Sequence, residues 1–215
     1  STIPSSGDGT GGAGDIFVND AVSWTASGTP TTLTLNADRN VDINAAITAT
    51  NGNLAVCCGQ DVNVNAAITT TNGSVLLAAG RDINQRAAIT TTDGNLMMCA
   101  ANNVNIFSAI TVTRSTNDPT RSLGLARGLT LSADTDGTGP GIAGGTVVID
   151  SLAPKVTVTN APTSIYYNPV SYDGPTDYRP RFTLTGSALT DYKQYMLVFA
   201  AGGDKTFDGN TTATL

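Results

Sequence analysis

The chain has 215 residues and is acidic, with 11 Lys and Arg against 17 Asp and Glu and a formal net charge of −6. Only 13% of the residues are charged, and the helix-favouring Glu and Lys are scarce beside Gly, Ala, Thr and Asn, so we predict an all-β protein. The basic residues are scattered singly and no run of about 18 apolar residues occurs, which argues against a nucleic-acid partner and against membrane insertion.

The first residues are polar and rich in Gly and Ser. We expect residues 1–13 to be a flexible lead-in and residues 14–24, GDIFVNDAVSW, to begin the fold as an irregular first turn of the array. Carboxylates lie near glycines in residues 6–15 and again in residues 134–141, an arrangement that favours Ca²⁺. Neither segment has the full spacing of a calcium loop. We therefore expect solvated Gly-rich turns, with no metal and no cofactor.

The strongest signal in the sequence is a gap-free internal repeat of 21 residues. Three units align as LTLNADRNVDINAAITATNGN, LAVCCGQDVNVNAAITTTNGS and VLLAAGRDINQRAAITTTDGN, over residues 33–53, 54–74 and 75–95. A fourth unit begins at Leu96 and is interrupted by an insertion at residues 115–128, after which LTLSAD restarts the pattern. A fixed period near twenty is typical of stacked repeats, because one unit cannot bury its own apolar face.

Within each unit the apolar residues alternate with others, as in Leu33-x-Leu35-x-Ala37, which predicts strands rather than helix. Turn signals such as Asn51-Gly52 divide the unit into three strands, and we expect the glycine to supply the positive φ of the corner. A hairpin meander would pair each strand with its sequence neighbour. The constant register instead pairs each residue with its equivalent one unit later, about 4.8 Å away. We therefore predict a right-handed, three-sided parallel β-helix over residues 14–152.

The repeat sorts the side chains into columns along the predicted coil. We expect three columns to form the core: Leu33, Leu54, Val75 and Leu96; Leu35, Val56, Leu77 and Met98; and Ile47, Ile68, Ile89 and Ile110. Gln85 occupies the place of an Ile or Val in its own column, so we expect either a bulge or a hydrogen-bond partner for its amide. We assign Thr70 to the outer surface.

The three cysteines cannot all be paired within the chain. Cys58 falls in an inward column, whereas Cys57 and Cys99 share an outward column two units apart, about 9–10 Å, which is too far for a disulfide. Because the chain has no His, a metal or reactive-thiol site is the weaker alternative. We interpret the cysteines as small hydrophobic residues.

The outward positions of the first strand become more apolar along the array, from Thr34 through Ala55 to Leu76 and Met97, before Thr130. An apolar column of this kind is usually covered. We expect cover from the insertion or the C-terminal segment of the same chain, with contact to a second chain as the alternative. Our candidate residues for an assembly contact are Leu76, Met97, Phe207 and Leu215.

The C-terminal part of the chain lacks the repeat. Residues 153–203 carry the tyrosines, and we expect them to form non-repetitive strands that cap or flank the β-helix. Residues 204–215 contain strand-forming Thr and Phe but are too few to fold alone. We expect this tail to begin a further domain or to be donated to the open strand edges of another chain, which would build a head-to-tail filament.

Several segments resemble a known family. AGRDIN (79–84), AAITTTDGNL (87–96) and GIAGGTVVIDS (141–151) resemble the repeat region of filamentous-haemagglutinin-like proteins exported by two-partner secretion. SIYYNPVSYDGPTDY (164–178) resembles the junction that leads, in such proteins, into domains named for a Tyr-Asp-Gly motif. Here that motif appears as TFDG (206–209), with Phe in place of Tyr, and the Asn-Pro-Asn-rich secretion domain is missing. The resemblance implies a β-helical shaft at a Gram-negative cell surface, with residues 204–215 as the first strand of an incomplete YDG-type domain.

Parallel β-helices also include polysaccharide lyases and hydrolases, whose sites need convergent carboxylates, often with Arg, Lys or His. The candidates here are Asp61 and Asp82, with Asp42, Arg39 and Arg81 nearby. Their column reads Asn40, Asp61, Asp82, Asn103 and so recurs with the repeat. Recurrence is typical of turn-stabilising side chains rather than of a catalytic pair. We predict no catalytic residues and no enzyme activity.

The sequence therefore favours the structural shaft of a secreted bacterial cell-surface adhesin, involved in cell adhesion or a biofilm matrix, with any host or matrix receptor bound by other parts of the full protein. A self-assembling extracellular filament subunit that polymerises head to tail is the first alternative. A polysaccharide-binding or polysaccharide-cleaving β-helix is the second.

Overall fold

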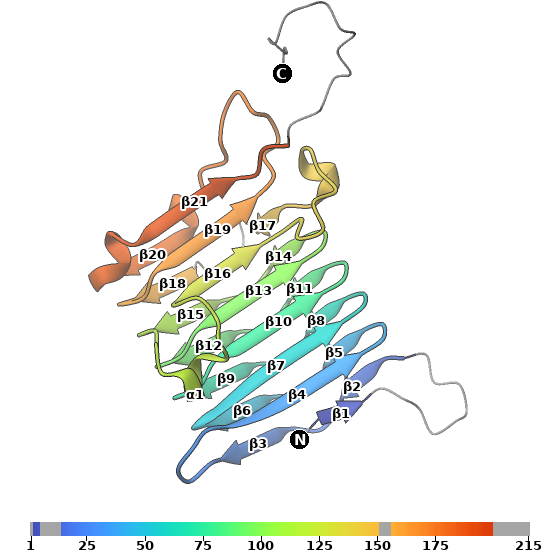
Figure 1. The fold of residues 1–215 in the computed structure, drawn as a ribbon, viewed down its shortest axis with the longest axis vertical. Coiled ribbons are helices and arrows are strands. Elements are labelled where there is room, and N and C mark those ends of the chain that lie inside the picture. The colour runs from blue at the N-terminus through green and yellow to red at the C-terminus, as the bar shows by residue number, and fades with distance from the viewer. Residues whose placement is uncertain (1, 5–13, 151–155, 200–215) are drawn as a thin grey trace, which may run out of the picture.

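The computed structural model describes residues 2–4, 14–150 and 156–199, and there the chain winds into a coil of short parallel strands (Figure 1). The strands form three sheets that run along the coil. Sheet A contains β1 (Thr2–Pro4), β4 (Thr31–Ala37), β7 (Gly52–Cys58), β10 (Val75–Ala79), β13 (Leu96–Ala100), β16 (Leu129–Ser132), β19 (Thr163–Tyr167) and β21 (Tyr192–Met196). Sheet B contains β2 (Ile16–Val18), β5 (Val41–Ile43), β8 (Val62–Val64), β11 (Ile83–Gln85), β14 (Val104–Ile106) and β17 (Val147–Ile149). Sheet C contains β3 (Val22–Thr25), β6 (Ile47–Thr50), β9 (Ile68–Thr71), β12 (Ile89–Thr92), β15 (Ile110–Thr113), β18 (Val156–Thr159) and β20 (Phe182–Thr185).

The strand register confirms the predicted repeat. Val75 pairs with Leu54 on one side and Leu96 on the other, and Ile89 lies in the same way between Ile68 and Ile110. Every strand pair within the three sheets is parallel, and as far as β19 each neighbour in a sheet is reached only after the chain has visited the other two sheets. β20 and β21 follow β18 and β19 without a described strand of sheet B between them. The protein is therefore a three-sided, right-handed parallel β-helix, as predicted.

The core is the axis of the coil, filled by the inward columns. Leu54, Ile68, Leu77 and Ile89 are fully buried, and each such side chain contributes about 1.5–3 kcal/mol of transfer free energy. Leu33 is only half-buried because it lies at the N-terminal end of the coil, where β1 pairs with residues 34–36 of β4 and leaves residues 31–33 without a neighbour on that side among the described strands.

Gln85 takes an inward place in β11 and is 0% exposed. Its Nε2 donates to the carbonyl oxygens of Ala87, at 2.6 Å, and Ala109, at 3.2 Å. Its Oε1 accepts the backbone N–H of Ser108. The expected hydrogen-bond partners are therefore present, and because Gln85 keeps its register between Val64 and Ile106, the bulge that was the alternative does not form.

The corner after sheet C differs from the expectation. The positive φ belongs to Asn51, Asn72 and Asp93, at 55°, 53° and 54°, and not to the glycine that follows each of them. Glycine is required for another reason. A Cβ on Gly73 would overlap the carbonyl oxygen of Gly52, which lies one turn of the coil, or one rung, below it. Asn and Asp tolerate the left-handed region well. The Asn or Asp therefore supplies the positive φ of the corner, and the glycine after it allows the close approach of the next rung.

Thr70 was wrongly assigned to the outer surface. It is 0% exposed and points into the core, because β9 begins with inward Ile68 and the side chains of a strand alternate. Its neighbours Thr69 and Thr71 are the outward residues of this strand.

Both expected ends of the β-helix need correction. Thr2–Pro4 is a strand of sheet A, in a segment that was expected to be flexible. At the other end, β18 to β21 pair in parallel with β15, β16, β18 and β19, so residues 156–196 continue the coil instead of capping or flanking it. The predicted C-terminal end of the β-helix at residue 152 was wrong. Strand pairing depends on backbone geometry and on the alternation of inward side chains, and both persist beyond the point where the 21-residue spacing ends.

Candidate functional site

The corner column that holds the candidate carboxylates is a ladder of hydrogen bonds. The side chain of each member accepts the backbone N–H one rung later: Asn40 from Asp61, Asp61 from Asp82, and Asp82 from Asn103, at 3.1, 3.2 and 2.9 Å. The ladder begins at Asp15 and ends on the N–H of Thr146. This is the turn-stabilising arrangement that its recurrence predicted.

Two arginines lie along the same ladder. Arg81 binds Asp61 through Nε and Nη2, with the first contact at 2.7 Å, and Arg39 binds Asp15 in the same way. The hydrogen bond from Arg81 lowers the pKa of Asp61, and burial of the carboxyl opposes this shift only in part. A general acid needs a raised pKa. The oxygens of Asp61 are also occupied, so this carboxylate is suited to holding the corner together.

The second proposed calcium segment is organised around Asp134. Its two carboxylate oxygens accept from the backbone N–H groups of Thr138, at 2.8 Å, and Gly139, at 3.1 Å, and from Nδ2 of Asn168, at 2.8 Å. Asp134 thus closes its own loop. Across the described residues no group of three His, Cys, Asp or Glu side chains lies close enough to hold a metal ion. The first proposed segment falls largely on residues 5–13, outside the described residues.

The cysteines lie where the columns placed them. Ala78 pairs with Cys57 on one side and with Cys99 on the other, so these two thiols lie two rungs apart. All three cysteines are free. Burial raises the pKa of each thiol, which keeps it protonated and weakly nucleophilic.

The insertion, residues 115–128, folds back against the N-terminal ends of strands β7, β10 and β13 in sheet A. It contains the short helix α1 (Pro119–Ser122), which Asp118 caps by accepting the N–H of Thr120. Asn53 and Asn95 donate from Nδ2 to backbone carbonyls of the insertion, at Thr120 and Thr116, and Ser74 donates to that of Arg121. Three successive rungs therefore hold the insertion in place. The sequence signal for this contact is the polar residue that follows the corner glycine of each unit: Asn53, Ser74 and Asn95.

Of the four candidate assembly residues, the structure describes two. Leu76 and Met97 are half-buried on the outer face of sheet A, two residues after the points at which Ser74 and Asn95 hold the insertion. Phe207 and Leu215 lie outside the described residues. A contact of Leu76 and Met97 with a second chain stays a prediction.

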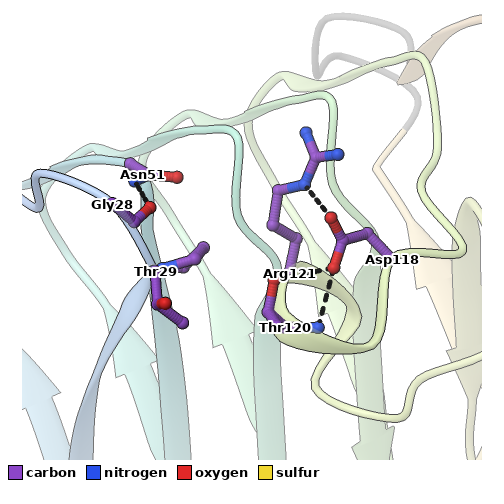
Figure 2. Close-up of a pocket in the computed structure, with 7 residues that line it drawn as sticks. Gly28, Thr29, Asn51, Asp118, Thr120 and Arg121 are labelled. Atoms are coloured by element: carbon purple, nitrogen blue, oxygen red, sulfur yellow. Dashed lines mark hydrogen bonds and ion pairs between the residues drawn. The ribbon is translucent and has the colours of Figure 1, made fainter.

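A cleft of about 440 Å³ lies between the insertion and the turn before β4, lined by Gly28, Thr29, Pro30, Asn51, Asp118, Thr120 and Arg121. Figure 2 shows its two walls, with Asn51 on one and the Asp118–Arg121 pair on the other. Nδ2 of Asn51 donates to the carbonyl oxygen of Gly28 at 2.6 Å, and Nε of Arg121 donates to Asp118 at 3.0 Å. These hydrogen bonds join groups within the same wall, and none joins Asn51 to the Asp118–Arg121 pair across the cleft between these described residues.

Among the described residues, strands at both ends of the coil have no neighbour on their outer side. At the N-terminal end, a cleft of about 360 Å³ is lined by Val22, Trp24, Thr31, Thr32 and Leu33, three of which are half-buried apolar side chains packed against the core. At the C-terminal end of the described coil, β20 and β21 are the last described strands of sheets C and A, and the last described strand of sheet B is β17, one rung earlier. Phe182 and Tyr192 meet edge to face there, with ring centroids 5.2 Å apart.

The three outer faces differ in chemistry. On sheet B, amides form a ladder in which Asn63 donates to Asp42, Asn84 to Asn63 and Asn105 to Asn84, at 2.9–3.1 Å. On sheet A the outward residues are mixed, and on sheet C they are threonines. The threonine face was not predicted, because Thr70, the central residue of the triplet at 69–71, was placed outside instead of Thr69 and Thr71.

No family model, no curated protein and no solved structure matches this chain. The resemblance to filamentous-haemagglutinin-like proteins therefore stays a prediction. None of the helices in the described part of the chain has the length and apolar character needed to cross a membrane.

Proposed function

We propose that this chain is part of the structural shaft of a secreted bacterial surface adhesin that acts in cell adhesion or in a biofilm matrix. The observation that carries the proposal is the continuity of the coil, in which sheets A and C add a strand at every rung from β3 and β4 to β20 and β21. A load along the axis is shared by backbone hydrogen bonds of sheets A and C at each rung, and of sheet B as far as β17, which suits a rod that holds a distal site away from a cell.

The side chains support the same role. The carboxylates of the corner ladder are engaged with backbone N–H groups and arginines, and in the cleft beside the insertion Asp118 is paired with Arg121. These groups are used to stabilise the coil.

The proposal is tested on cells that produce the protein. Immunogold labelling is expected to place it outside the envelope, and deletion of its gene is expected to lower attachment or matrix formation. Inserting two further copies of residues 54–95 adds four rungs and should lengthen the rod by about 19 Å, since neighbouring strands lie about 4.8 Å apart. Label confined to the cell interior, or unchanged attachment and matrix after deletion, would sink the proposal.

A second candidate function is a filament subunit that stacks head to tail. The apolar cleft at Val22, Trp24 and Leu33, together with the strand edges at both ends, favours it. In β3 the N–H groups of Val22 and Ala26 face β6, where they bind the carbonyls of Ala46 and Thr50. Because alternate residues of a parallel strand face opposite neighbours, the N–H of Thr25 points toward the end of the coil.

Thr25→Pro removes that outward donor and leaves the ladder to β6 intact, whereas Thr25→Ala keeps the donor and serves as the control. If chains stack by strand pairing, electron microscopy should show filaments that are shorter in the proline variant only. Filaments of equal length in both variants would exclude pairing through β3. Deleting residues 205–215 tests donation of the tail in the same assay, and undiminished filament length would exclude it.

A further inference from the structure

The outer face of sheet C is a lattice of hydroxyl groups. Its first rank consists of Ser23, Thr48, Thr69, Thr90, Thr111, Thr157 and Thr183, and its second rank of Thr25, Thr50, Thr71, Thr92, Thr113, Thr159 and Thr185. Each member pairs in register with the next along the sheet, without a slip across seven strands. The excursions of the chain at residues 115–128 and 133–146 leave the coil between sheets C and A and between sheets A and B, so they do not break the lattice.

The spacing of the lattice follows from strand geometry. Neighbouring threonines of one rank lie about 4.8 Å apart, and the two ranks lie about 6.6 Å apart, twice the rise per residue of a parallel strand. The constant register keeps both ranks straight. Threonine is β-branched, so its χ1 is restricted and its hydroxyl and methyl groups hold fixed directions before any ligand arrives.

Strand propensity alone does not explain the threonines. Threonine favours strands in general, and a purely structural role would distribute it over all three sheets. The corresponding outward column of sheet A is mixed: it reads Thr34, Ala55, Leu76, Met97, Thr130 and Ser164, and on sheet B the outward positions of β8, β11 and β14 are Asn63, Asn84 and Asn105. The enrichment belongs to one face.

The hydroxyls of this face are available to solvent. Among the described residues only one pair of them, Thr159 and Thr185, is joined by a hydrogen bond, at 2.7 Å. The two ranks contain no charged and no aromatic side chain, and the nearest ion pair, Asp93 with Arg114, is closed on itself at the corner.

We propose that the threonine face of sheet C binds ice. The oxygen lattice of ice repeats at spacings close to those of the two ranks, so each hydroxyl can hydrogen bond to water at a lattice position while the methyl groups order the water between them. The ligand is a neutral solid, which the uncharged face complements. A flat polysaccharide surface is the rival ligand, but sugar rings are usually held by aromatic platforms, and the face has none.

The test uses the full chain and three variants. The wild-type protein is mixed with a single ice crystal below its melting point, and growth arrest, crystal shape and incorporation of fluorescently labelled protein into ice are recorded. Thr90→Tyr/Thr92→Tyr places two bulky rings in the centre of the face. Thr90→Val/Thr92→Val keeps the shape and removes only the hydroxyls. Thr34→Tyr, on the outer face of sheet A, is the matched control.

We expect the wild-type protein to shape and arrest ice, the tyrosine pair to lose most of this effect, the valine pair to weaken it, and the control to retain it, with circular dichroism showing an unchanged β-helix in each. Wild-type protein that neither shapes ice nor enters it would overturn the proposal. Equal activity in the tyrosine pair and in Thr34→Tyr would overturn it as well, as would binding to crystalline cellulose or chitin without binding to ice.

Discussion

The rungs between residues 31 and 113 and the rungs between residues 129 and 196 share one backbone arrangement but differ in sequence. In the first region each strand is followed by its equivalent 21 residues later. In the second region the intervals widen: Thr113 pairs with Thr159, and Thr163 pairs with Tyr192. The extra residues are placed at corners, as the loop held by Asp134 and the segment before β20 illustrate (Figure 1).

The difference shows what a rung requires. Leu131 and Ile165 are buried, and each alternates with an outward neighbour, as Leu77 and Met98 do in the repeat. The corners are free to change length because a corner contributes few pairs to the sheets. A regular repeat is therefore one way to build this coil and not a condition for it.

The largest effect is expected from a charge in the centre of the repetitive region. Ile89→Asp buries an unpaired carboxylate in a column whose members are fully buried, which costs several kcal/mol and should unfold the array. Thr90 is the next residue along β12 and points outward, so Thr90→Asp should change the free energy of unfolding little. Urea unfolding followed by circular dichroism measures both, and comparable losses in the two variants would contradict the register.

A matched pair in the second region sharpens the comparison. Leu184→Asp in β20 should open only the last rungs, because each rung of a stacked array is stabilised mainly by its neighbours. Hydrogen exchange should then rise in residues 182–196 and stay low in β7 to β13, while Thr183→Asp should leave both unchanged. Global unfolding by Leu184→Asp would mean that the C-terminal rungs belong to one cooperative unit with the repeat.

The sequence predicted what the repeat encodes and missed what it does not. The parallel register and the columns at Leu54 and Ile68 followed from periodicity, and the cost of an unpaired amide predicted that Gln85 would find a hydrogen-bond partner or sit at a bulge, but not which groups would bind it. The continuation through β18 to β21 was missed because corners of variable length hide the period. Thr70 was misplaced because a TTT triplet carries no alternation of its own. The contact of Asn53 with the insertion depends on a helix 67 residues away, which no local pattern reveals.

Corner glycines should be sensitive to one added methyl group. Gly73→Ala directs a Cβ against the carbonyl of Gly52, so the rungs must separate locally, at a cost of about 1–3 kcal/mol. Gly174 lies in the non-repetitive region, and a Cβ added there would meet open space, so Gly174→Ala should be nearly neutral. Thermal unfolding of the two variants measures the contrast, and an unaffected Gly73→Ala would show that the corner has room to relax.

Two buried threonines offer a stabilising change. The hydroxyls of Thr70 and Thr91 are buried without a hydrogen-bond partner among the described residues. Thr91→Val keeps the shape and removes the unpaired hydroxyl, so it should stabilise the protein by about 1 kcal/mol. Thr92→Val on the outward side of the same strand should have almost no effect. A loss of stability in Thr91→Val would indicate that water reaches the hydroxyl.

The smallest effect concerns pH and the Asp61–Arg81 pair of the corner ladder. The hydrogen bond from Arg81 lowers the pKa of Asp61 in the folded protein. A lowered carboxyl pKa contributes stability that is present above the unfolded value of about 3.9 and is lost as the pH falls through the folded pKa.

Asn already stands at positions 40 and 103 of the same ladder, so Asp61→Asn should keep the bond to the N–H of Asp82 and lose only the ion pair. Because Arg81 is largely exposed, we expect a loss below about 1 kcal/mol at neutral pH, smaller in high salt, that disappears in acid. A stability difference between wild type and Asp61→Asn that is the same at neutral and acidic pH would show that the pair is not linked to folding.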